Sequence, residues 1–145
     1  PYLQPHFDFH FYTKTAAEIE AIDCTDATKP SQAPAGYELP DVNIPGIGDL
    51  AGLCVPKMGM HALLASELSS PAPFQKTMVV GYYKSEPIFV EPMLTRAALL
   101  ERKSFTLDMP AVSGTPAGAR YPNAFRADYD STAQAYRFVF TLPPG

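Results

Sequence analysis

The sequence is poor in basic residues and has no long apolar run. It contains 11 Lys and Arg residues among 145, scattered along the chain, and its formal net charge is -4. A general nucleic-acid-binding protein needs a basic face, so we do not expect nucleic acid as a partner. No apolar run approaches the roughly 18–20 residues of a membrane-spanning helix, so we expect no transmembrane segment.

Motifs for several common enzyme chemistries are also missing. There is no Gly-x-Ser-x-Gly nucleophile motif, and the glycine-rich residues 46–52 have the wrong spacing for a phosphate loop. Asp128, Asp130 and Thr132 lack the glycine and the terminal glutamate of a calcium loop. The composition is 46% hydrophobic and 18% charged, which excludes a disordered chain. We therefore expect a single folded domain over residues 1–145.

The two cysteines, Cys24 and Cys54, allow only one intramolecular pairing. In an exported protein they would form a disulfide between the first helix and a mid-chain loop, whereas in the cytosol they would be two buried thiols. We expect the disulfide. Its closed loop of about 30 residues would stabilise the fold by roughly 3–4 kcal/mol.

The alternation of residue types predicts mainly β-structure. Residues 5–12 alternate polar and aromatic side chains, which is typical of a strand with one buried face. Two hairpins are predicted, the first with strands at 76–83 and 88–91 and the second at 125–129 and 136–142. We expect Pro92 to end the second strand of the first hairpin, because proline cannot donate to a β-ladder. In the last strand, the apolar residues should point inward: Tyr136, Phe138, Phe140 and Leu142.

Two short helices are expected between these strands. Thr15 and Glu18 form a capping-box pattern before residues 16–22, and Thr95 can cap a helix over 96–102. Residues 30–57 are rich in proline and glycine and predict a long irregular excursion. The resulting fold class is mainly β (α+β), an antiparallel curved sheet or a small β-barrel with two short helices.

The predicted strand at residues 5–12 carries the first part of a candidate site. His6, Asp8 and His10 project from one face of this strand, with successive side chains of the row about 6–7 Å apart. His61 follows a glycine later in the chain. Glu91 lies within an apolar strand, where a buried carboxylate would need a partner.

We interpret His6, His10, His61 and Glu91 as candidate metal ligands. Imidazoles with a carboxylate bind divalent Zn, Mn, Fe, Ni or Cu, or a small polar molecule. Asp8 or Glu91 could then act as a general base on bound water. The set has a chemical similarity to cupin metal sites, although its order and spacing differ. The alternative is that these side chains form an ordinary polar surface or a hydrogen-bonded cluster.

Four segments in this order resemble a family of exported bacterial proteins of unknown function. They are HFDFHFY at residues 6–12, MGMH at 58–61, EPMLT at 91–95 and Tyr121-Pro122 before the final hairpin. The resemblance implies a mainly β fold, a periplasmic or secreted location with the signal sequence already removed, and self-assembly into homo-oligomeric rings. It implies no particular reaction.

Two functions follow as hypotheses. In the first, the chain is an exported protein with a divalent-metal or small-ligand site, with or without enzymatic activity on a small molecule. In the second, it is a non-enzymatic binding or structural module of the cell envelope that assembles through its sheet. Convergence of the His6, His10 and His61 nitrogens on a common point would favour the first hypothesis, whereas side chains that spread toward solvent would remove most of the support for an enzyme.

Overall fold

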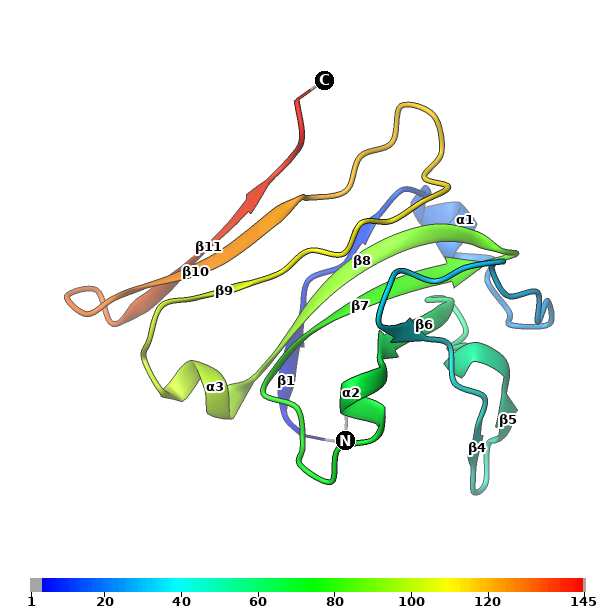
Figure 1. Ribbon diagram of the computed structural model, residues 1–145, viewed down its shortest axis with the longest axis horizontal. Helices are drawn as coiled ribbons and strands as arrows, with labels where there is room; N and C mark the ends of the chain where they lie inside the picture. Colours follow the sequence, from blue (N-terminus) through cyan, green and yellow to red (C-terminus); the bar gives the residue numbers. More distant parts are fainter. Residues whose placement is uncertain (1–3, 145) are drawn as a thin grey trace.

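The computed structural model describes residues 4–144 and shows a mainly antiparallel β fold (Figure 1). The larger sheet has the strand order β1-β8-β7-β6-β3, and β2 pairs with β8 beside β1. Its strands are β1 (His6–Asp8), β2 (Phe11–Tyr12), β3 (Tyr37–Glu38), β6 (Met60–Leu64), β7 (Lys76–Tyr83) and β8 (Glu86–Thr95). The curved sheet is confirmed. The β-barrel alternative is wrong, because the sheets of the described chain do not close.

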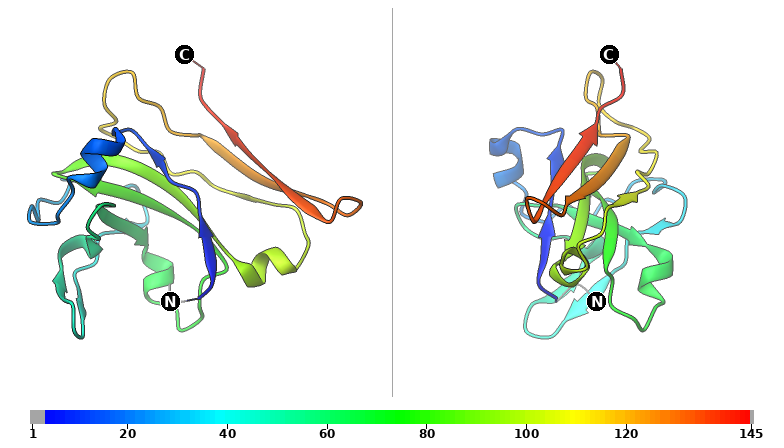
Figure 2. Two further views of the ribbon diagram at one scale, coloured as in Figure 1. Left: turned by 180° about the vertical axis from the view of Figure 1, so that it is seen from behind. Right: turned by 90° about the vertical axis from the view of Figure 1, so that its left-hand side faces the viewer.

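A second sheet has the order β11-β10-β9 and forms a separate layer in both views of Figure 2. Its strands are β9 (Phe105–Leu107), β10 (Ala124–Asp130) and β11 (Ala135–Thr141), so the predicted C-terminal hairpin is confirmed. Aromatic side chains fill the space between the two sheets: the Phe9 ring lies 4.9 Å from Phe138 and 5.5 Å from Phe140. Leu142 is an exception to the predicted pattern. It lies beyond the end of β11 and is 55% exposed.

The two faces of the larger sheet have separate cores, as the alternation of side chains along a strand requires. One face, with Val80, Val90 and Leu94, packs toward the second sheet and the loop that precedes β10. The opposite face carries Val79 and Phe89 and is covered by segments from the first half of the chain. The candidate site lies on this opposite face.

The predicted strand at residues 5–12 is interrupted, and Pro92 explains why. β1 pairs Asp8 with Met93, and β2 pairs Phe11 with Val90, so both strands share one register along β8. That register places Phe9 opposite Pro92. The Phe9 amide donates to the Pro92 carbonyl at 3.1 Å, but proline has no N–H for the reciprocal bond.

The prediction that the strand ends at Pro92 is wrong, since β8 continues to Thr95. The proline is tolerated because its nitrogen faces this interruption. Its β7 neighbour Met78 still pairs with it in the same register. The missing donor therefore breaks only the edge strand, which β1 and β2 together form.

Both predicted helices are confirmed, and a third was missed. α1 (Ala16–Glu20) has the full capping box between Thr15 and Glu18, and α3 (Arg96–Leu100) is capped by the Thr95 hydroxyl. α2 (Ala65–Leu68) has no side-chain cap, so the sequence contains no capping residue that would indicate its start. No helix within residues 4–144 is long and apolar enough to span a membrane.

The proline- and glycine-rich excursion forms a hairpin and a short 3-10 helix. The hairpin pairs β4 (Val42–Ile44) with β5 (Gly48–Leu50) and projects away from the sheets (Figure 1). The helix η1 (Ala51–Leu53) follows it directly. The next residue, Cys54, forms the predicted disulfide with Cys24, so that part of the prediction is confirmed.

Candidate functional site

The β-ladder brings the N-terminal polar row beside Glu91. Because Asp8 pairs with Met93 and Phe11 with Val90, the same register places His10 opposite Glu91. The two side chains are close: His10 Nε2 lies 3.3 Å from Glu91 Oε1. The structure thus brings these two of the candidate site residues together.

His6 and Asp8 form a second pair further along β1. His6 Nε2 lies 3.4 Å from Asp8 Oδ1, and both side chains are partly exposed. The His6 Nδ1 nitrogen contacts the carbonyl oxygen of Gln4, which fixes the ring orientation. This pair lies at the edge of the site, whereas the His10–Glu91 pair lies inside it.

Glu91 is a buried carboxyl group whose hydrogen-bonding capacity is not used. Its side chain is 2% exposed, and its Oε2 atom is buried with no hydrogen-bond partner. Burial, with a smaller contribution from the negative charge of Asp8, raises the pKa of Glu91 to about 8. The carboxyl group is therefore mostly protonated at neutral pH.

His10 is also neutral at this pH, so its contact with Glu91 is not an ion pair. Burial lowers the pKa of His10, and the nearby Asp8 carboxylate only partly opposes this effect. The Nε2 atom of His10 is buried without a hydrogen-bond partner, because the 3.3 Å contact with Glu91 lacks hydrogen-bond alignment. A neutral carboxyl group and a neutral imidazole thus face each other, and each keeps an atom without a hydrogen-bond partner.

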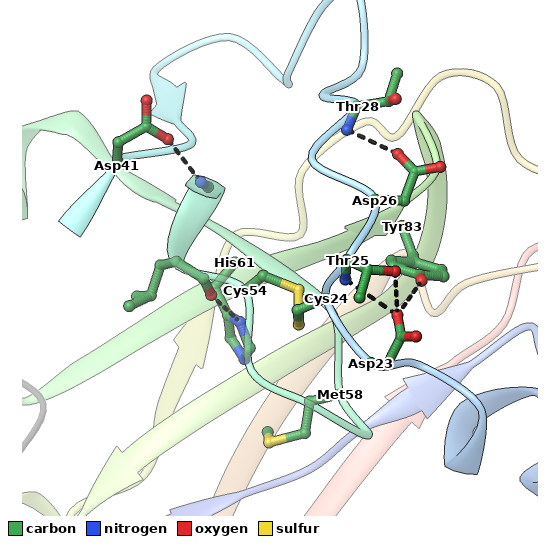
Figure 3. The surroundings of a disulfide bond; sticks show 12 residues. Asp23, Cys24, Thr25, Asp26, Thr28, Asp41, Cys54, Met58, His61 and Tyr83 are labelled. Carbon is green, nitrogen blue, oxygen red and sulfur yellow. Dashed lines mark hydrogen bonds between the residues drawn. A yellow bond between two sulfur atoms is a disulfide. The ribbon is translucent and has the colours of Figure 1, made fainter. Parts of the chain in front are cut away.

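His61 is held from β6 by a loop carbonyl. Its Nδ1–H donates to the Leu53 carbonyl of η1 at 3.0 Å, so the neutral ring has its lone pair on Nε2. Burial lowers the pKa of His61 in spite of this hydrogen bond. Figure 3 shows the ring below η1, close to the Cys24–Cys54 disulfide.

The ring of Phe89 packs against both His10 and His61. It lies in edge-to-face contact with both imidazoles, at 5.1 Å from His10 and 5.4 Å from His61. Tyr12 stacks on His10 at 5.5 Å with nearly parallel planes. Burial, with a smaller contribution from Glu91, raises the pKa of Tyr12 to about 12.

A pocket of about 190 Å³ lies between the sheet and the loop that follows η1. The sheet supplies its floor, including Glu91 and Val79, and His6 and Asp8 stand at its side. The other lining residues are Leu53, Val55, Met58, His61, Leu63 and Met93. His10 does not line the pocket. The wall is therefore almost entirely apolar, although two residues with carboxyl groups, Asp8 and Glu91, line it.

We call residues 51–59 the roof of this pocket, because Leu53, Val55 and Met58 cover it. The roof is held at several points. Gly52 donates its amide hydrogen to Asp41 at 2.8 Å, and a tight turn joins Val55 to Gly59 through two backbone hydrogen bonds of 2.9 Å. The Lys57 amide donates to the Ile22 carbonyl at 2.8 Å. Cys54 adds the disulfide.

The four predicted metal ligands are not gathered into one centre. Within residues 4–144, no group of three or more His, Cys, Asp or Glu side chains is placed to hold a metal ion. The cause is the strand pairing: His10 lies on the row of Glu91 and Val79, whereas His61 lies opposite Gly81, one row away. The geometry favours a small-molecule pocket over a preformed metal centre.

Several residues of the site escaped the sequence reasoning. Tyr12 continues the alternation of His6, Asp8 and His10, so this signal was present. Phe89 lies two residues before Glu91 in β8, so the alternation of side chains places both on one face of the strand. The roof residues gave no signal, because only the tertiary fold brings residues 51–59 over the sheet.

Comparison of the chain with protein-family models, with curated proteins and with solved structures found no significant match. The resemblance of its motifs to an exported bacterial family therefore stays a prediction.

Proposed function

We propose that this chain is an extracytoplasmic protein that binds a small, mainly apolar molecule in the pocket between its larger sheet and the roof. The observation that carries the proposal is the buried carboxyl group of Glu91, which lines the pocket and has an oxygen without a hydrogen-bond partner. Buried polar atoms in folded proteins are nearly always paired, so an unpaired one in a pocket indicates a missing partner.

The size and lining of the pocket define the kind of ligand. A cavity of about 150 Å³ lined by apolar side chains holds benzene. The pocket of about 190 Å³ therefore suits a molecule of similar size with one polar group. Ligand sites in proteins commonly combine apolar walls with a few fixed polar groups in this way.

The extracytoplasmic location is supported by the disulfide. Cys24 and Cys54 are paired, and disulfides persist mainly in exported proteins. Cys54 belongs to the roof, so the disulfide ties the roof of the pocket to Cys24. The alternative ligand is a divalent metal ion, so the binding experiment below also includes zinc.

The proposal is tested by filling the pocket. Leu63 lines it and is buried, and Leu63→Phe should occupy its volume. Leu100→Phe is the matched control, because Leu100 lies on α3 and is 59% exposed. Binding of toluene, benzyl alcohol, benzylamine and zinc ions is followed by changes in amide NMR signals.

We expect at least one ring compound to shift signals of residues 51–63 in the wild type and in Leu100→Phe. Leu63→Phe should lose this response while its remaining spectrum stays that of a folded protein. If all three proteins respond alike, or if zinc alone binds, the pocket is not the small-molecule site that we propose.

A specific feature also favours the alternative function, assembly through the sheet. Among the described strands, β1 pairs only with β8 and β11 only with β10, so both have a free edge. Phe7 on β1 is 53% exposed. Free edges and exposed apolar side chains are common in protein interfaces. Light scattering after size exclusion tests this, and a strictly monomeric species at high concentration would argue against homo-oligomers.

A further inference from the structure

We infer that the ligand is a protonated amine with an apolar body, whose ammonium group binds the Glu91 carboxylate. This inference rests on the proposed function, because it names the chemical class that the same pocket would take. Three features of the pocket carry it: the sign of the charges along its wall, the unused acceptor capacity of Glu91, and the lack of three converging metal ligands among residues 4–144.

The only groups on the pocket wall that can carry a negative charge are Asp8 and Glu91. None of the described residues that line the pocket is Lys or Arg. His61, the one buried imidazole on the wall, has its pKa lowered by burial and is neutral near pH 7. Apart from the partly exposed imidazole of His6, which contacts Asp8, the described wall has no group that would bind an anion, and its two carboxyl groups favour a cation.

An ammonium group supplies the donors that Glu91 lacks. The Oε2 atom of Glu91 has no hydrogen-bond partner, and its Oε1 atom has only the poorly aligned contact with His10. An ammonium carries three N–H donors, whereas an alcohol carries one and a carboxylate none. A hydrogen bond between two charged groups is also shorter and stronger than one between neutral groups.

A metal ion fits this arrangement less well. A zinc ion takes four ligands in tetrahedral geometry, and no three candidate ligands of the described chain converge. Of the candidate ligands, His10 does not line the pocket, and the Phe89 ring packs against both its imidazole and that of His61. An amine needs only one carboxylate and an apolar wall, and the pocket has both without rearrangement.

Binding of an amine should be coupled to loss of a proton from Glu91. The free carboxyl group is mostly protonated at pH 7, because burial raises its pKa to about 8. An ammonium group beside it favours the carboxylate, so the O–H bond of Glu91 breaks and the proton leaves to the buffer. The ammonium keeps its own protons. As the pH falls, Glu91 takes up a proton again, and the ligand is released.

The titratable groups that face Glu91 come from the N-terminal edge strand and from β6. No charged side chain reaches it from β7, where its neighbour is Val79, or from the roof residues Leu53, Val55 and Met58. The groups that surround it from the other elements are His6, Asp8, His10, Tyr12 and His61. Asp8 adds a negative charge, which raises the pKa of Glu91 further and also attracts the ligand cation.

The experiment compares three probes of similar shape: benzylamine, benzyl alcohol and benzoate. Their affinities for the full chain at pH 7 are measured by titration calorimetry in buffers that differ in ionisation enthalpy, which gives the number of protons released. Glu91→Gln tests the anchor. Glu86→Gln is the matched control on the same strand, since Glu86 is exposed and does not line this pocket.

We expect benzylamine to bind at least tenfold more tightly than benzyl alcohol, with release of nearly one proton, and benzoate not to bind. Glu91→Gln should remove both the preference and the proton release, and Glu86→Gln should keep them. If benzyl alcohol binds as tightly as benzylamine, or no proton is released, the amine inference is wrong while the proposed pocket stands. If no probe binds, the amine inference is wrong, and if toluene also fails to bind the wild type, the proposed pocket is wrong as well.

Discussion

The Phe89 ring lies directly over the backbone of Gly81, its partner across the β7–β8 ladder. A Cβ atom at position 81 would overlap three carbons of that ring. The glycine is required for space and not for an unusual backbone conformation, because its φ is not in the left-handed region. The ring, placed in this way, contacts both His10 and His61.

The substitution Gly81→Ala should therefore disturb the whole site. Overpacking of this kind typically costs about 1–3 kcal/mol. We expect a loss in this range in urea unfolding, together with altered NMR signals of the His10 and His61 rings. The matched test is Phe89→Leu, whose smaller side chain leaves room for the new methyl group. If Gly81→Ala costs the same in both backgrounds, the overlap with Phe89 is not the cause.

This pair also shows how far the sequence could predict the structure. The alternation along residues 5–12 and 88–91 was enough to place His10 and Glu91 on faces of strands. The partnership of Gly81 with Phe89 could not be found, because nothing local distinguishes a glycine that receives a ring from one that forms a bulge. Register and long-range contacts decide that question.

The metal centre was expected for a related reason. His6, His10, His61 and Glu91 lie on the same face of one sheet, although the sequence indicated a shared face only for His6 and His10. Sharing a face does not imply convergence: strands lie about 4.8 Å apart, and His61 is three strands away from His10. The order of strands in the sheet, which pattern alone does not reveal, separates them.

Glu91 should make the protein less stable at alkaline pH. Its pKa is about 8 in the folded protein against an ordinary value of 4.5, so the folded state binds more protons between these values. The free energy of unfolding contributed by this group therefore falls as pH rises from 4.5 to about 8, and the loss is complete above that range. At roughly 1.4 kcal/mol per pKa unit, the effect is on the order of 3–5 kcal/mol.

Glu91→Gln removes this titration and nearly preserves the shape of the side chain. We expect the variant to gain stability relative to the wild type between pH 5 and pH 9, as measured by urea unfolding at each pH. Glu86→Gln, on an exposed carboxylate of the same strand, should follow the wild type. Parallel pH profiles for wild type and Glu91→Gln would show that the carboxyl group is not perturbed.

The turn between β7 and β8 contains two non-glycine residues in the left-handed region. Lys84 has φ 50° and Ser85 has φ 62°, as in a type I′ hairpin turn, where glycine or asparagine is usual. Ser85→Gly should relieve left-handed strain, which costs an L-residue about 1–2 kcal/mol. The greater backbone entropy of unfolded glycine offsets about 0.5–1 kcal/mol of this gain, so the fold should become more stable. The amide of Ser85, which donates to the Thr28 carbonyl at 3.1 Å, is unaffected. Thermal unfolding measures the gain, and a lower midpoint would contradict the assignment of strain.

The disulfide should contribute both to global stability and to the order of the roof. Cys24 and Cys54 are 30 residues apart, and closing a loop of this length contributes roughly 3–4 kcal/mol. Replacing both with alanine should lower the free energy of unfolding by about that amount. Alanine is preferred to serine because Cys54 is buried, where an unpaired hydroxyl would add its own cost.

A second measurement separates the two effects of the disulfide. Amide hydrogen exchange should accelerate most strongly at residues 51–59, because Cys54 lies at the centre of the roof and Leu53 holds His61. Reduction of the wild-type protein should reproduce this pattern without any substitution. Uniform acceleration across the chain would mean that the disulfide stabilises the fold as a whole and that Asp41, Ile22 and the turn at Val55 hold the roof without it.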